Sequence, residues 1–193
     1  MKSLSFILVA GAGFLLAGCL VPSLHPLFTD KDIVVRFELV GAWTAEEGGA
    51  GWLFSLEPDS SYSVAYSDYG DKDTSWFTAH LVDLNGHLFM DLYPNPSDVL
   101  SDAYKSHLIA AHTFSKVALD SRGLTLAILD VDWLRENLDA GRIHLAHEEL
   151  GPGDLVLTAS TAELQKFILS VVDDTDAFSS MDLYRANRVT DSI

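Results

Sequence analysis

The sequence predicts a mainly β fold of the α+β class. We expect a curled antiparallel sheet or a small barrel, with one short internal helix and a C-terminal helix packed on it. Apolar and polar residues alternate with period two in several short runs between residues 52 and 93, which indicates strands with one buried face. Turn-forming residues separate these runs. One run at 161–172 has the helical period of apolar residues, so a helix should cover the sheet.

The first two strands are predicted at 52–56 and 62–66, where aromatic and aliphatic residues alternate with serine and other small or polar residues. Pro58-Asp59-Ser60 lies between them and supplies turn chemistry. The two strands should therefore form a hairpin.

Asn85-Gly86 is the strongest turn signal in the chain, because both central positions of a type I′ turn need positive φ. It joins predicted strands at 77–84 and 87–93. A two-residue loop fixes the register, so His80 should face Asp91. The face that this register turns toward the core is uniformly apolar and consists of Ala79, Leu81, Met90 and Leu92.

Two further strands are predicted at 114–119 and 124–129, and they should pair with each other. A short helix is predicted at Val131–Leu138, with Asp130 as its N-cap and Gly141 just after its end.

The last predicted elements are strands at 143–147 and 155–158 and the helix at 161–172. Ser160 and Glu163 form a capping box at the start of this helix. Residues 99–112 fit neither period, so no element is predicted there.

Length and composition limit the classes of protein. The chain has 193 residues, 48% of them hydrophobic, and a formal net charge of -16. At roughly 150 residues per domain, one domain is expected. Nucleic acid is excluded as a partner, because phosphate recognition needs a basic surface. The chain has one cysteine, which rules out an intramolecular disulfide.

The first residues have the pattern of an export signal. Lys2 precedes an apolar run at 4–16, which is shorter than the roughly 20 residues that a membrane-spanning helix needs. The run ends in Leu16-Ala17-Gly18-Cys19, which resembles the lipobox of bacterial lipoproteins. That resemblance implies cleavage after residue 18, a diacylglycerol on the Cys19 thiol and an acyl chain such as palmitate on the new amino group. The alternative is an uncleaved transmembrane anchor.

The resemblance also implies a domain organisation and a location. Residues 1–18 would be the signal peptide, 19–32 the lipidated N-terminus with a short tether, and 33–193 a single globular β-rich domain. Without Lys2, the mature side-chain charge is 11 − 28 = -17. Leu20 follows the cysteine where an aspartate would signal inner-membrane retention in enterobacterial lipoproteins. We therefore expect attachment to the outer membrane, facing the periplasm.

The predicted tether is apolar and contains Pro22 and Pro26, so it should be stiff and able to pack against the body. Residues 22–29 resemble the opening of some uncharacterised bacterial envelope lipoproteins, a resemblance that implies no activity.

Gly41-Ala42-Trp43 resembles the Gly-x-Trp signature near the start of lipocalins. The resemblance implies a barrel with Trp43 closing one end and a helix after the barrel strands. The alternative is an open sheet packed on the helix, with Trp43 as an ordinary core aromatic.

No catalytic motif, cofactor or metal site is predicted. His144 and His147 should point to opposite faces of a strand and not bind zinc together. The facing pair His80 and Asp91 is interpreted as a stabilising surface pair. Two acidic clusters could bind Ca2+ but are interpreted as solvated loops; they are Asp68, Asp71 and Asp73, and Asp173, Asp174 and Asp176.

Aromatic residues give the best functional lead. If the sheet curls, they could line a pocket for an apolar or amphipathic ligand, although core packing is the competing interpretation. The candidate ligand-binding residues are Trp43, Trp52, Tyr62, Tyr66 and Trp76.

The sequence thus favours a non-enzymatic, membrane-anchored module that binds an apolar small molecule or an envelope protein, or has a structural role. The alternatives are an envelope hydrolase and an enzyme inhibitor of the immunity type.

Overall fold

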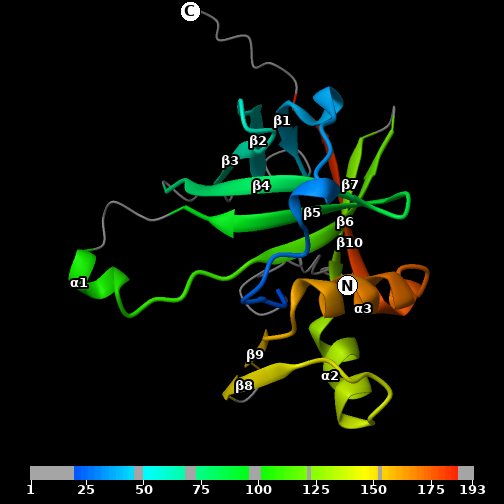
Figure 1. The fold of residues 1–193 in the computed structure, drawn as a ribbon. Helices are drawn as coiled ribbons and strands as arrows, with labels where there is room; N and C mark the ends of the chain where they lie inside the picture. Colours follow the sequence, from blue (N-terminus) through cyan, green and yellow to red (C-terminus); the bar gives the residue numbers. More distant parts are fainter. Residues whose placement is uncertain are drawn as a thin grey trace, which may run out of the picture.

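Eight antiparallel strands close into a barrel in the order β1-β10-β7-β6-β5-β4-β3-β2 (Figure 1). The computed structural model describes residues 20–45, 50–67, 73–95, 101–120, 123–151 and 154–186. The fold confirms the predicted mainly β class. The barrel is closed, so the alternative of an open sheet is wrong. It is consistent with a lipocalin-like architecture. The barrel strands are β1 (Gly41–Thr44), β2 (Gly51–Leu56), β3 (Tyr62–Ser67), β4 (Ser75–Leu84), β5 (His87–Pro94), β6 (Thr113–Leu119), β7 (Leu124–Leu129) and β10 (Phe178–Arg185).

A second layer lies outside the barrel, below it in Figure 1. Most of it is one insertion between β7 and β10: α2 (Val131–Asp139), the two-stranded sheet of β8 (His147–Gly151) and β9 (Asp154–Leu157), and α3 (Thr161–Val171). The other short elements are α1 (Asp102–Lys105) and the 3₁₀ turns η2 (Asp30–Asp32), η3 (Phe37–Leu39) and η4 (Thr175–Ala177). The predicted C-terminal helix is α3, and one barrel strand, β10, follows it.

The predicted hairpin register is confirmed. Asn85 and Gly86 have φ of 56° and 89°, as a type I′ turn requires. β4 and β5 pair His80 with Asp91. The pairs β2–β3 and β6–β7 also form as predicted.

The barrel interior is one hydrophobic core. Its members alternate with outward residues along each strand, and the predicted apolar face belongs to it. The buried residues of this inner core are Leu39, Trp43, Trp52, Phe54, Tyr62, Val64, Ala79, Leu81, Met90, Val117, Leu124, Leu126 and Leu183.

A second core lies between the outer barrel wall and the second layer. It explains why Val82 and Phe89 are buried although they point away from the barrel interior. The buried residues of this outer core are Val21, Leu27, Val82, Leu84, Phe89, Phe114, Leu129, Leu134, Leu145, Leu155, Leu157, Ala159, Leu164, Phe167, Ile168 and Val172. Residues 20–29, called the N-terminal segment below, contribute to this core directly.

The helix ends follow the predicted chemistry. Asp130 caps α2 by accepting a hydrogen bond from the Trp133 amide at 2.8 Å. Gly141 takes φ of 67° just after the helix. At α3, Ser160 and Glu163 form the predicted capping box.

The predicted strand at 143–147 is wrong, because β8 begins only at His147. Backbone contact with the β9 side continues only as far as Ala146, and a side-chain interaction of His147 lies next to it. The Ala146 carbonyl accepts hydrogen bonds from the amides of both Thr158 and Ala159. A ring nitrogen of His147 lies 2.8 Å from the Leu145 carbonyl oxygen. Side-chain bonds of this kind compete with sheet formation.

Candidate functional site

The N-terminal segment forms backbone hydrogen bonds with two other stretches of the chain. Ser23 and His112 exchange both backbone hydrogen bonds, each 2.8 Å long. On the other side, the Leu24 amide donates to the Leu157 carbonyl and the Leu157 amide donates to Pro22. The segment thus runs as an added strand between the residue that precedes β6 and the end of β9.

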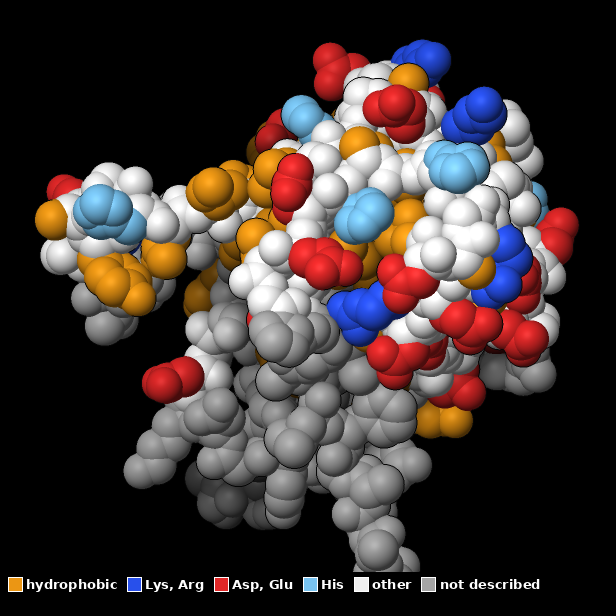
Figure 2. All heavy atoms as spheres, turned by 90° about the horizontal axis from the view of Figure 1, so that it is seen from below, with side chains coloured by type: hydrophobic (Ala, Val, Ile, Leu, Met, Phe, Trp, Pro, Cys, Tyr) orange, Lys and Arg blue, Asp and Glu red, His pale blue; other side chains and the backbone are white. Residues whose placement is uncertain are grey.

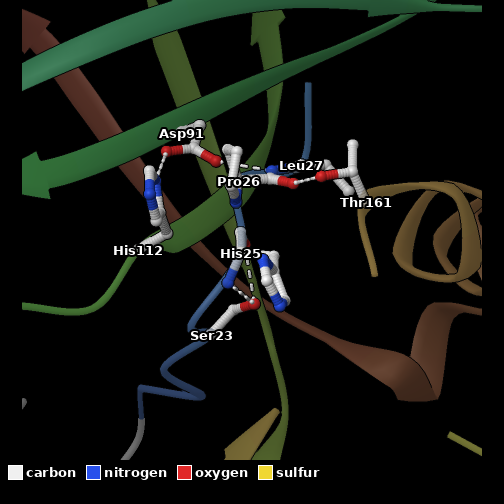
Figure 3. A network of polar contacts seen from close by, with 7 residues as sticks. All are labelled: Ser23, His25, Pro26, Leu27, Asp91, His112 and Thr161. Carbon is white, nitrogen blue, oxygen red and sulfur yellow. Dashed lines mark hydrogen bonds and ion pairs between the residues drawn. The ribbon is translucent and has the colours of Figure 1, made fainter. Parts of the chain in front are cut away.

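A buried carboxylate fixes the segment to the barrel wall (Figure 3). Asp91 on β5 is only 1% exposed. Its Oδ2 accepts a hydrogen bond from the Leu27 amide at 2.8 Å, and its Oδ1 lies 2.7 Å from His112 Nδ1. A carboxylate without a proton only accepts, so the imidazole donates. These donors offset the cost of removing a charge from water.

Helix α3 holds the same segment from the opposite side. The Thr161 hydroxyl donates to the Pro26 carbonyl at 2.8 Å, as Figure 3 shows. Gln165 Nε2 donates to the Leu27 carbonyl and to Asp32 Oδ2, each at 2.9 Å. The segment is therefore clamped between β5 and α3, and we call Asp91, His112, Thr161 and Gln165 the clamp.

The interpretation of His80 and Asp91 as a surface pair is wrong. The two residues face each other across β4 and β5, but Asp91 is buried and bonds to His112. His80 instead packs against Phe28, with 4.4 Å between ring centroids. Burial lowers the pKa of His80, although attraction to Asp91 and Asp59 opposes the shift. The N-terminal segment covers this face of the barrel and so changes the environment of both groups.

The clamp contains half of a hydrolase triad, a histidine oriented by a carboxylate. Ser23 pairs with His112 through its backbone, but its Oγ donates to the His25 carbonyl at 2.7 Å and accepts from the His25 amide. This hydroxyl therefore stabilises a local turn. The hydrogen bonds of this network hold the N-terminal segment in place.

The predicted aromatic residues do not share one pocket. Trp43, Trp52 and Tyr62 are buried in the inner core, and Tyr66 packs against it. Trp76 lies on the outer wall and is 52% exposed. Successive side chains of β4 point to opposite faces of the sheet. Trp76 therefore points outward, because the neighbouring Phe77 packs against the inner core.

Trp43 and Arg185 join the first and last barrel strands. The Arg185 guanidinium lies 4.0 Å from the centre of the Trp43 ring, a cation–π contact. Arg185 also donates to the carbonyls of Glu38 and Val40, and Trp43 Nε1 donates to the Leu39 carbonyl at 2.8 Å. These bonds hold η3 against the barrel.

Two hollows of the described surface are open to solvent. One of about 450 Å³ is polar and is lined by Glu57, Pro58, Asp59, Ser61, Ser63, Thr78 and Asn95. The other, of about 390 Å³, is lined by Leu138, Ile143, His144, Leu145, Ala146 and His147. Neither lies in the barrel interior, which the side chains of the inner core occupy.

The remaining candidates from the sequence are the residues considered as metal ligands. No group of three or more His, Cys, Asp or Glu residues is arranged there to hold a metal ion. Asp174 accepts a hydrogen bond from the Asp176 amide and caps η4. Cys19, Asp68 and Asp71 lie outside the described residues.

Sequence reasoning missed two residues that matter here. His112 belongs to the stretch for which no element was predicted, and Arg185 belongs to a strand that was not predicted. Neither has a local sequence signal, since each partner lies far away in the chain: Asp91 for His112 and Trp43 for Arg185.

None of the helices within the described residues is long and apolar enough to cross a bilayer. No protein-family profile, curated protein or solved structure matches this chain.

Proposed function

We propose that the protein is a non-enzymatic lipoprotein of the bacterial cell envelope, held by acyl chains on Cys19 to the outer membrane and facing the periplasm. The lipobox at residues 16–19 carries this proposal. The clamped N-terminal segment supports it, because it connects the lipidated residue directly to a folded body. The side-chain charge of -17 repels anionic headgroups, so the acyl chains supply the attachment.

Within this class we favour a partner-binding or structural role. The inner core occupies the barrel, whereas the outer wall exposes apolar residues in register. Ala42, Leu53, Ala65 and Trp76 pair in sequence across four strands, and all of them but the half-buried Ala65 are exposed. An exposed apolar row on a sheet is typical of a protein contact surface.

The anchor is tested by Cys19→Ser. We expect loss of metabolic lipid labelling and loss of the protein from the membrane fraction. Unchanged lipid labelling of this variant would contradict the anchor.

The contact surface is tested by placing a photo-crosslinking residue at Leu53 in cells. We expect a discrete protein adduct, identified by mass spectrometry, and none from the same residue at Asp132, whose side chain is 92% exposed on α2. Equal adducts from both positions would contradict a specific surface.

A second candidate is binding of a small amphipathic molecule. Trp52 Nε1 is the one buried side-chain polar atom of the described residues that has no hydrogen-bond partner, and Tyr66 packs against its ring at 4.7 Å. A ligand with an acceptor group would satisfy this indole. Native mass spectrometry of membrane-extracted protein should then show a bound mass that Trp52→Phe removes.

A further inference from the structure

A protruding arm interrupts the barrel between β5 and β6. Residues 101–112, called the arm below, contain α1 and stand away from the body (Figure 1). Tyr104, Leu108 and Ile109 are exposed there, and Ile109 is 80% exposed. Figure 2 shows hydrophobic side chains gathered on this lobe. Apolar residues on a projecting loop lose solvent contact only when something outside the body covers them.

The base of the arm is bonded to the N-terminal segment through the two backbone hydrogen bonds of Ser23 and His112. Tyr93 packs against the His112 ring at 4.6 Å and supports the same junction. The two segments together expose five large apolar side chains: Leu20, Leu24, Tyr104, Leu108 and Ile109.

Chain length places this apolar group near the lipid attachment point. Cys19 is four residues from Ser23, and Ile109 is three residues from His112. At about 3.5 Å per residue, Cys19 lies within roughly 14 Å of the junction and Ile109 within roughly 11 Å. Acyl chains on Cys19 therefore hold the arm close to a bilayer surface.

The local charge also suits a bilayer. The N-terminal segment carries no Asp, Glu, Lys or Arg, and the arm carries only Asp102 and Lys105, which cancel. The acidic excess of the chain thus lies elsewhere, and Figure 2 shows acidic side chains spread over the body. This surface meets no net repulsion from anionic headgroups.

We propose that the exposed side chains of the arm, together with Leu20 and Leu24, form a second contact with the lipid bilayer that carries the Cys19 anchor. This inference rests on the proposed function. Leucine and isoleucine side chains enter the boundary between headgroups and acyl chains, and Tyr104 lies at the headgroup level, as amphipathic aromatic residues do. Two attachment points, the lipid and the arm, hold the barrel in one orientation above the membrane.

The test uses a nitroxide spin label on lipidated protein in phosphatidylcholine vesicles. Cys19 is the single native cysteine, so acylation leaves an introduced cysteine as the only free thiol. One label is placed at Ile109→Cys. The matched control is Phe37→Cys, because Phe37 is 75% exposed and lies in η3.

Collisions with oxygen and with a water-soluble nickel chelate report the depth of each label. We expect the ratio of oxygen to nickel accessibility to be several-fold higher at residue 109 than at residue 37. Equal ratios would overturn the bilayer contact. Protection of residue 109 from both reagents would also overturn it, since this result indicates a protein partner or a second copy of the chain.

The lipidated chain without an introduced cysteine distinguishes failure of the anchor from failure of the arm contact. If it takes up no thiol label while residue 109 stays in water, the anchor stands and the arm contact fails. If it takes up the label, Cys19 is free and both proposals fail.

Transfer between vesicles gives an independent measurement. Replacing Leu108 and Ile109 by serine should speed transfer of the lipidated protein roughly tenfold or more, as expected for losing buried aliphatic side chains. Leu150→Ser, at an exposed residue of β8, should leave the rate unchanged. Equal rates for both variants would overturn the proposal.

Discussion

Gly41 shows how one residue without a side chain permits a contact between the ends of the barrel. Its φ is +123°, and a Cβ atom there would lie 2.6 Å from Arg185 Nη1. The glycine is thus required twice, for its backbone conformation and for the approach of the arginine to Trp43. The Gly-x-Trp pattern therefore has a physical basis in this chain.

Gly41→Ala should lower the free energy of unfolding by about 2 kcal/mol or more, because strain and collision add. Gly86→Ala is the matched control: Gly86 also has positive φ, but nothing lies within 4 Å of its added Cβ. It should cost only about 1 kcal/mol. Urea unfolding measures both variants, and equal losses would contradict the role assigned to Arg185.

His80 gives the folded protein a dependence on pH. The pKa of its imidazole lies below the ordinary 6.5, chiefly because of burial. The groups that act on it by charge are Asp91, Asp59, Asp30 and His112. The unfolded chain binds the proton more tightly, so the contribution of neutral His80 is complete above pH 6.5 and is lost as pH falls toward the lowered pKa.

When the pH is lowered from 7.5 to 5.5, we therefore expect the urea midpoint of the native chain to decrease. The midpoint of His80→Gln should decrease less. The same substitution at exposed His107 leaves His80 in place and should keep the native fall. If His80→Gln and the native chain lose stability equally, the buried imidazole is not the source.

At the scale of elements, the sequence predicts those with a strong local period or turn. The β4–β5 hairpin and α3 belong to this group. β10 was missed because only Met181 and Leu183 of its eight residues join or pack against the inner core. β1 was missed because it has four residues, of which only Trp43 is buried.

The clamp was not predicted from the sequence, for a different reason. It joins residues from the N-terminal segment, β5, the end of the arm and α3, so it is set by tertiary packing. The predicted facing of His80 and Asp91 was correct, but the pattern of β4 and β5 does not say what covers them. A second apolar layer makes both faces of these strands buried, as occurs in covered sheets.

Leu164→Ala tests how firmly α3 docks on the barrel. Leu164 is fully buried in the outer core, so its truncation should cost about 2–5 kcal/mol. Lys166→Ala, at an exposed position of the same helix, should change stability by no more than about 0.5 kcal/mol. Denaturant unfolding compares the two, and a small loss at Leu164 would show that the helix packs loosely.

For the molecule as a whole, the barrel wall is shared by two cores, and the N-terminal segment is part of one of them. Val21 and Leu27 belong to the outer core, and backbone bonds to His112 and Leu157 extend the segment as a strand. The predicted tether is therefore a structural element over most of its length.

Asp91→Ala removes the acceptor of the Leu27 amide and of His112. Leaving these donors unpaired should cost roughly 3 kcal/mol. Amide hydrogen exchange should rise at Ser23–Leu27 well above its rise at the α2 amides. Asp91→Asn keeps one acceptor oxygen and should have a smaller effect. Uniform exchange changes across the chain would contradict a clamp specific to the segment.

The bonded N-terminal segment also determines how force passes through the molecule. A slack linker absorbs a pull by straightening before its domain feels any load. Here only Leu20 and Val21 separate Cys19, the proposed lipidation site, from Pro22, whose carbonyl accepts the first of these backbone bonds, from the Leu157 amide. If Cys19 carries the proposed acyl chains, tension between the membrane and the barrel would load the Ser23–His112 and Leu24–Leu157 backbone bonds almost at once. With such an anchor, the domain would follow each movement of the membrane without the delay that a slack linker causes.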